Sequence, residues 1–271
     1  MAKRLLLISI AIITLIVACS GTNSNGGSDE PDTQSLTIFA ASSLTEAFSE
    51  LGDIFEAEHP GSQVTLNFAG SQQLAQQLAQ GAPGDVFASA NRKQMQTAID
   101  SDRIEDANAK IMIGNRIVII FSLDDLGGVR RIADLARPEL RLVLGSENVP
   151  IGAYSLEFLE KASQDPAFGP EFKENVLNNV VSYEQNVRAV LNKVTLGEAD
   201  AGIVFESDLS ESDSVKIGAL RIPPALNVNA SYYIAPTNDA ANPGLAAAFI
   251  DLVISLEGQD ILAKYGFIPV Y

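Results

Sequence analysis

Two stretches of the chain, LTIFAASSLTEAF at residues 36–48 and VTLNFAGSQQLAQQL at residues 64–78, share one pattern. In each, a short apolar run ends in small and hydroxyl-bearing residues, and an amphipathic pattern begins at once. This pattern predicts a β-strand that passes directly into an α-helix. The first turn of such a helix presents unpaired backbone N–H groups and a partial positive charge. Both stretches therefore predict a turn that can bind an anion.

The same alternation of apolar runs and helical patterns continues along the chain, which predicts an α/β fold with mainly parallel sheets flanked by helices. The expected strands are 36–40, 64–68, 85–89, 111–121, 140–145, 200–205 and 228–235. The expected helices are 44–58, 72–80, 92–100, 153–163, 171–177, 187–196, 244–256 and 258–264. Gly81 and Gly197 stand where two of these helices are expected to end in a left-handed residue.

In parallel α/β sheets, ligands bind beyond the carboxyl ends of the strands, where helix N-termini point. Ser43 and Ser71 add hydroxyl donors to two such turns, and Arg188 is the one cationic residue among them, placed to pair with Glu184. An oxyanion held there is therefore expected to be bound by neutral N–H and O–H dipoles. The four turns are AASSL (40–44), AGSQQ (69–73), NVPIGAY (148–154) and YEQNVRA (183–189).

A purely structural alternative exists for both serines. SLTE at 43–46 matches a capping box, with Ser43 at the N-cap and Glu46 at the third helical position. Ser71 is open to the same interpretation, since serine is a common N-cap. Two matched turns in successive strand–helix units favour a binding role.

The N-terminus has the pattern of a secretory signal at residues 1–18, because Lys3 and Arg4 precede a long apolar run. The run is also close to the length of an uncleaved membrane anchor. Its end, IVAC, resembles a bacterial lipobox, in which Cys19 receives lipid; an ordinary signal peptide is the alternative. Residues 19–35 lack large apolar side chains until the first strand, so we expect a flexible tether that anchors an exported protein to the membrane.

Composition excludes several functions. The formal net charge of −16 becomes −18 when Lys3 and Arg4 are removed with the signal, which argues against nucleic-acid binding. With His59 as the single histidine, neither a Ser-His-Asp triad nor a histidine metal cluster is expected.

Asp85 is expected to stabilise a turn. The acidic run 206–214 lacks the glycine of a calcium loop and is expected to be a solvated face.

Five segments resemble, in order and over residues 36–271, the extracytoplasmic molybdate-binding proteins of ABC transporters. The resemblance implies two α/β lobes joined by crossover strands near 116–121 and 228–235, which close over one tetrahedral oxyanion. The expected lobes are 36–115 plus 228–271, and 116–227. The segments are FAASSLTEAF, NFAGSQQLAQQLAQGAPGDVFASA, VPIGAY, NVRAVLNKVTLGEADAGIVFESD and LAKYGFIPV.

When the binding positions of the family are matched to this sequence, four donors to the oxyanion are implied. Two are the hydroxyls of Ser43 and Ser71, and two are the backbone N–H groups of Ile151 and Val187. The family usually has a tyrosine hydroxyl as a fifth donor, in GIVY. This chain reads GIVF, so Phe205 has no donor at that position. Ser42, Tyr154 and Tyr183 are possible substitutes.

The resemblance further implies a monomeric binding protein, without catalysis or cofactor, that delivers molybdate or tungstate to a membrane permease from the periplasm or cell surface. Sulfate, which has the same shape and charge, is the alternative ligand. Two other classes stay open. An exported enzyme on the same bilobal fold would need an acid, base or nucleophile in the cleft. A structural surface protein would have no need of matched anion-binding turns.

Overall fold

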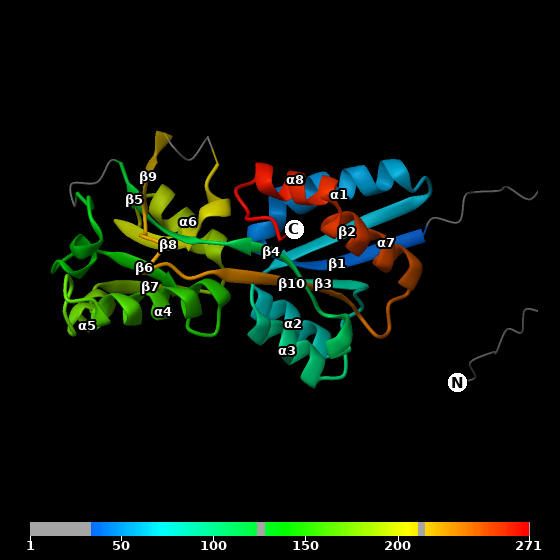
Figure 1. The fold of residues 1–271 in the computed structure, drawn as a ribbon, viewed down its shortest axis with the longest axis horizontal. Helices are drawn as coiled ribbons and strands as arrows, with labels where there is room; N and C mark the ends of the chain where they lie inside the picture. The colour runs from blue at the N-terminus through cyan, green and yellow to red at the C-terminus, as the bar shows by residue number, and fades with distance from the viewer. Residues whose placement is uncertain (1–33, 124–127, 211–214, 271) are drawn as a thin grey trace, which may run out of the picture. The chain divides into compact units, whose positions relative to one another are not determined.

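The computed structural model describes residues 34–123, 128–210 and 215–270 (Figure 1). The expected signal segment 1–18 and the lipidation site Cys19 lie outside the described residues. Gln34 and Ser35, expected at the end of the tether, are instead the first residues of strand β1. Within the described ranges, none of the helices has the length and apolarity needed to cross a membrane.

The first sheet has five strands in the order β2-β1-β3-β10-β4. Strands β1, β2 and β3 run parallel, and β10 runs antiparallel to both of its neighbours. We call this sheet, with the helices packed on it, lobe I. Its strands are β1 (Gln34–Ala41), β2 (Ser62–Ala69), β3 (Val86–Ser89), β4 (Lys110–Asn115) and β10 (Ala230–Pro236).

The second sheet, with its helices, forms lobe II and has the order β7-β6-β8-β5-β9. Strands β7, β6 and β8 are parallel, and β5 is antiparallel to β8 and β9. Both sheets are thus mixed, because β5 and β10 each enter their sheet from the other lobe and not through a helical crossover. The strands are β5 (Ile117–Ser122), β6 (Leu142–Gly145), β7 (Val180–Glu184), β8 (Ala201–Phe205) and β9 (Ile217–Arg221).

The chain changes lobe at Arg116. The sequence pattern predicts one strand over 111–121, but the structure divides it into β4 and β5, which belong to different sheets. At the break the Asn115 side chain accepts a hydrogen bond from the Arg116 N–H at 2.9 Å, and the Asn227 side chain accepts one from the Ile117 N–H at 3.2 Å. Side-chain acceptors therefore replace the strand ladder where the chain crosses.

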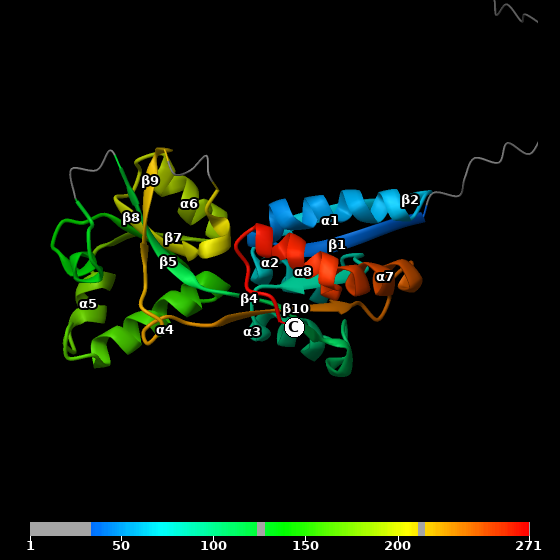
Figure 2. The ribbon, with the colours of Figure 1, turned by 45° about the horizontal axis from the view of Figure 1, so that its top comes forward.

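Helices cover both faces of each sheet (Figures 1 and 2). In β1, Ile38 packs in the core with Phe48 of α1, whereas Phe39 points to the opposite face and packs with Leu74 of α2. In lobe I, α1 (Thr45–Glu58), α7 (Pro243–Ile254) and α8 (Leu256–Lys264) cover one face, and α2 (Ser71–Ala79) and α3 (Arg92–Asp100) cover the other. In lobe II, α4 (Pro150–Gln164) and α5 (Phe172–Leu177) lie opposite α6 (Val187–Thr195). Short 3-10 turns are η1 (Ser42–Leu44), η2 (Asp106–Asn108), η3 (Ile132–Ala136) and η4 (Glu206–Asp208).

Every helix that the sequence predicts is present, with ends shifted by three residues at most. Gly81 and Gly197 have φ angles of 89° and 72°, which confirms the predicted left-handed helix ends. Asp85 is buried and accepts hydrogen bonds from the N–H of Thr37 in β1 and from the N–H of Ala241 just before the helix at 243–254. Its role is thus structural, although one of the two bonds goes to a strand and not to a turn. Strands β7 and β9 were absent from the prediction.

Candidate functional site

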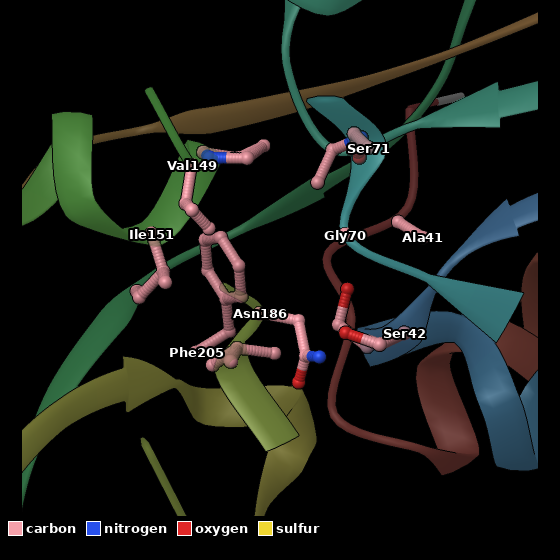
Figure 3. A pocket seen from close by; sticks show the side chains of 12 residues that line it. Ala41, Ser42, Gly70, Ser71, Val149, Ile151, Asn186 and Phe205 are labelled. Atoms are coloured by element: carbon pink, nitrogen blue, oxygen red, sulfur yellow. The ribbon is translucent and has the colours of Figure 1, made fainter. Parts of the chain in front are cut away.

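The four predicted turns meet around one cavity of about 10 Å³ (Figure 3). This volume holds about one water-sized group. Figure 3 shows residues of lobe I on one side of the cavity and residues of lobe II on the other. The lining residues are Ala41, Ser42, Ser43, Gly70, Ser71, Ala90, Val149, Pro150, Ile151, Asn186, Val187 and Phe205.

Ser43 lies in η1, between β1 and α1, and is 2 % exposed. Its hydroxyl is 2.9 Å from the hydroxyl of Tyr232, which lies on the crossover strand β10. The capping-box alternative is wrong, because α1 begins at Thr45 and no side chain caps it. Ser43 is therefore held by a tertiary contact at the cavity wall.

Ser71 is the first residue of α2 and is 1 % exposed. Its hydroxyl oxygen accepts a hydrogen bond from the N–H of Ala90, in the turn after β3, at 3.1 Å. Gly70 occupies the N-cap position, so Ser71 is not a cap either. Both serines thus line the cavity, and each hydroxyl has a hydrogen-bond partner on its other side. The partner is the Tyr232 hydroxyl for Ser43 and the Ala90 N–H for Ser71.

The N-termini of α4 and α6 form much of the lobe II wall. Ile151 and Val187 lie in the first turns of these helices, whose N–H groups have no partner inside the helix. No acceptor for either N–H is present among the described residues. The side chain of Asn186 caps α6 by accepting from the Ala189 N–H at 2.9 Å. Two backbone donors are therefore available at this wall.

Phe205 ends β8 and is 1 % exposed, packed edge-on between two tyrosine rings. Its ring centroid is 6.0 Å from that of Tyr154 and 5.6 Å from that of Tyr232. Of the three suggested substitute donors, only Ser42 lines the cavity. The Tyr154 hydroxyl is directed to the Ala90 carbonyl at 3.4 Å, its pKa raised by burial, and Tyr183 is 51 % exposed on β7.

Side chains of lobe I reach backbone carbonyls of lobe II beside the cavity. The amide nitrogen of Gln72 donates to the Gln185 carbonyl at 2.6 Å, and that of Gln94 donates to the Asn148 carbonyl at 2.8 Å. Gly70 fits closely here, since a Cβ at that position would lie 2.4 Å from the Gln185 carbonyl oxygen. The two lobes are therefore in contact in this structure, with the cavity between them.

Arg188 also bridges the lobes, but not as the sequence suggested. It pairs with Glu46 of α1 and with Asp208, whose carboxylate lies 3.3 Å from the guanidinium, whereas Glu184 pairs with Lys193. Asp208 is 1 % exposed and accepts from the Phe205 N–H at 3.1 Å. The expected solvated face is thus wrong for Ser207 and Asp208. Both are buried, since Asp208 caps the end of β8 and the Ser207 hydroxyl accepts a hydrogen bond from the Asn115 side chain at 2.8 Å. Residues 211–214 lie outside the described ranges.

The cavity lining contains no Asp, Glu, His, Lys or Arg. Across the described ranges, no cluster of three or more His, Cys, Asp or Glu residues is placed to hold a metal ion. The polar groups that line the cavity are hydroxyls, backbone amides and the Asn186 side chain. Such a wall suits a small anion that accepts hydrogen bonds.

Gly70 and Asn186 lie in two of the predicted turns but were not singled out within them, whereas Ala90 and Tyr232 were missed altogether. Asn186 carried a readable signal, because asparagine directly before a helical pattern is a preferred N-cap. Gly70 and Ala90 act through their backbone, and Tyr232 reaches Ser43 across 189 positions of sequence. No local pattern marks contacts of that kind.

The fold places a small cavity with a polar lining between two lobes, an arrangement that suits a binding protein for a small solute. The family model described as "Bacterial extracellular solute-binding protein" matches residues 36–268, and the chain belongs to that family. It is 37 % identical to the molybdate-binding protein ModA of Mycobacterium tuberculosis, over 96 % of this chain and 95 % of the relative. It is 30 % identical to the putative ABC transporter substrate-binding lipoprotein YvgL of Bacillus subtilis, over 96 % of each chain.

Solved structures share the fold. The periplasmic molybdate-binding protein of Azotobacter vinelandii superimposes with a TM-score of 0.71 at 17 % identity, over 87 % of this chain and 100 % of that one. The sulfate-binding protein SubI of Mycobacterium tuberculosis has a TM-score of 0.78 at 18 % identity, over 88 % and 87 % of the two chains. At these identities the likeness is one of fold, and it confirms the predicted two-lobed architecture.

Proposed function

We propose that this protein captures a tetrahedral oxyanion, molybdate or tungstate, outside the cytoplasm and delivers it to an ABC importer. The supporting observation is the convergence of two serine hydroxyls and two free backbone N–H groups on one cavity without a carboxylate. The identity to molybdate-binding relatives along almost the whole chain favours molybdate over other oxyanions.

In this proposal Ser43 and Ser71 donate from lobe I, and the N–H groups of Ile151 and Val187 donate from lobe II. Each donor is neutral, yet hydrogen bonds to a charged acceptor contribute about 1.5–3 kcal/mol each. The ligand needs no counter-charge at contact, and the repulsion from the acidic surface is screened over about 8 Å at physiological salt. The net charge of −16 is thus compatible with an anion site.

The cavity in this closed arrangement is small, so an ion enters only when the lobes separate. We expect an open form without ligand and a form closed around the ion, with the lobes slightly further apart than here, because the present cavity holds only about one water-sized group. The proposal assigns no role to a cofactor, and it is supported by a lining without Asp, Glu, His, Lys or Arg that could act as an acid or base.

Sulfate is the second candidate, because SubI has the same fold and the sulfate ion has the same shape and charge. Hydrogen phosphate is a useful negative control, since its O–H requires an acceptor and no carboxylate lines the cavity. Native mass spectrometry, on protein purified from medium with molybdate, tungstate, sulfate and phosphate, tests the proposal. Retention of one molybdate or tungstate supports it; retention of sulfate alone assigns the site to sulfate, and retention of none contradicts the proposal.

The lipid anchor on Cys19 belongs to the same proposal and is supported by the IVAC sequence and by the lipoprotein relative YvgL. The Cys19→Ser variant should lose lipid and partition into the aqueous phase of a detergent extraction. Equal partitioning of variant and unmodified protein into detergent contradicts the anchor and leaves the binding proposal intact.

A further inference from the structure

The hydroxyl of Tyr232 is fully buried behind the cavity wall and is not among the groups that line it. It lies 2.9 Å from the Ser43 hydroxyl and 3.3 Å from the side-chain nitrogen of Asn115. The three residues belong to η1, β10 and β4, all in lobe I, and thus stay together when the lobes separate.

The direction of these hydrogen bonds follows from the Asn115 amide. Its oxygen accepts from the Arg116 N–H at 2.9 Å, so its nitrogen is the atom that faces Tyr232 and Ser207. An amide nitrogen only donates, so the Tyr232 oxygen accepts from it. Among the described residues, the single Tyr232 proton then has one hydrogen-bond acceptor, the Ser43 oxygen.

Ser43 has one proton of its own, and its oxygen already accepts from Tyr232. That proton is therefore left for the cavity. Ser71 is arranged in the same way, since its oxygen accepts from the Ala90 N–H. Burial raises the pKa of Tyr232 well above its ordinary value, so its hydroxyl is protonated at neutral pH.

We propose that Asn115 and Tyr232 are positioning residues that fix the Ser43 hydroxyl as a hydrogen-bond donor to the oxyanion. This inference rests on the proposed function. The Asn115–Tyr232–Ser43 chain, which we call the relay, orients the donor before the ligand arrives and reduces the ordering that binding would otherwise require.

The direct test is Tyr232→Phe, which keeps the ring that packs on Phe205 and Phe267 and removes only the hydroxyl. By isothermal titration with sodium molybdate we expect affinity to fall about three- to tenfold, as for the loss of one oriented hydrogen bond. Tyr233→Phe is the matched control, because Tyr233 is the next residue of β10 and lies outside the cavity lining. Its affinity should equal that of the unmodified protein.

A double-mutant cycle separates positioning from a structural effect. In a Ser43→Ala background, Tyr232→Phe should cause no further loss of affinity, because the relay acts only through the Ser43 proton. The proposal is overturned if Tyr232→Phe lowers the molybdate affinity equally with and without Ser43→Ala. It is also overturned if Tyr232→Phe binds molybdate as tightly as the unmodified protein does. If the unmodified protein binds neither molybdate, tungstate nor sulfate, the proposed function fails and the relay with it.

Asn115→Asp tests the polarity of the relay. A carboxylate there accepts from Tyr232, so Ser43 must donate to Tyr232 and its proton turns away from the ligand. We expect a larger loss than in Tyr232→Phe. Adding Tyr232→Phe to this variant frees the Ser43 proton and should recover part of the affinity, although the new charge remains. No recovery would mean that charge alone weakens binding and would overturn the assigned direction.

Discussion

The two lobes build their halves of the cavity from different chemistry. Lobe I supplies the side-chain hydroxyls of Ser43 and Ser71, each backed by a buried partner. Lobe II supplies backbone N–H groups of Ile151 and Val187 at two helix N-termini, beside the apolar ring of Phe205. The lobe I half therefore depends on residue identity, whereas the lobe II half depends on where two helices begin.

We expect the largest loss of molybdate affinity when the two lobes are prevented from closing on each other. In Gly70→Ala the new Cβ would lie 2.4 Å from the Gln185 carbonyl oxygen of lobe II, closer than a Cβ can approach. Overpacking of this kind costs up to about 3 kcal/mol, which corresponds to roughly a hundredfold loss of molybdate affinity. Titration calorimetry measures the loss, and small-angle scattering should show less compaction on adding molybdate than in the unmodified protein.

Gly244→Ala is the matched control, because a Cβ there meets no atom within 4 Å. It should bind as the unmodified protein does. Full affinity and full compaction in Gly70→Ala would mean that the lobes do not close at this contact.

Removal of the lobe I donors comes next. Ser43→Ala and Ser71→Ala should each weaken binding by about 1.5–3 kcal/mol, the range for a hydrogen bond to a charged group. Neither serine caps a helix, so this loss is not explained by fraying. Titration beside thermal melting separates the effects. If the melting temperature falls while the molybdate affinity is unchanged, both serines have only a structural role.

The donors of lobe II are backbone N–H groups, so only a substitution that changes the backbone can remove them. Val187 is the first residue of α6 and follows Asn186, whose φ of −159° and ψ of 166° suit a residue before proline. Val187→Pro therefore removes one N–H donor at a position where helices tolerate proline. We expect a loss of about 1.5 kcal/mol or more in the free energy of binding.

Leu256→Pro, at the exposed first residue of α8, is the control for proline itself. It should leave molybdate affinity unchanged. If the two proline variants bind alike, the Val187 N–H is not a ligand donor.

A smaller effect is expected from the ion pair between Arg188 and Glu46, which joins the lobes at a partly exposed position. Glu46→Gln should weaken binding by no more than about 1 kcal/mol, because exposed pairs contribute little. The loss should shrink further at high salt, since screening weakens the pair. Titrations at low and high ionic strength check this, and a loss that is insensitive to salt would exclude an electrostatic origin.

The smallest effect is expected at Phe205. Phe205→Tyr adds the hydroxyl that the family usually carries, but the serines, the two N–H groups and Ser42 already surround the cavity. We expect the binding free energy to change by less than about 0.5 kcal/mol. Titration with molybdate and with sulfate measures this. A tenfold gain for molybdate alone would show that the position lacks a donor and helps to select the ion.

The helices and the cavity residues could be predicted because their signals are local. Hydrophobic periodicity marked α1 and α6, and small or hydroxyl residues after apolar runs marked the turns that line the cavity. The strands that were missed, β7 and β9, are the two edges of the lobe II sheet. Edge strands bury fewer residues, so Val180–Glu184 and Ile217–Arg221 alternate in exposure and lack a continuous apolar run.

What the sequence could not supply is pairing across long distances. The contacts of Tyr232 with Ser43 and of Asp208 with Arg188 depend on how strands and lobes come together. The break at Arg116 had a local signal, the polar Asn115–Arg116 pair within an apolar run, but its assignment to two sheets required the structure.

The central claim is that donors from both lobes hold one oxyanion in this cavity. A crystal structure of the protein with tungstate tests it most directly, because the anomalous signal of tungsten locates the ion without ambiguity. We predict one ion within hydrogen-bond distance of the Ser43 and Ser71 hydroxyls and of the Ile151 and Val187 N–H groups. An ion bound elsewhere, or one held by a single lobe in a closed protein, would contradict the account.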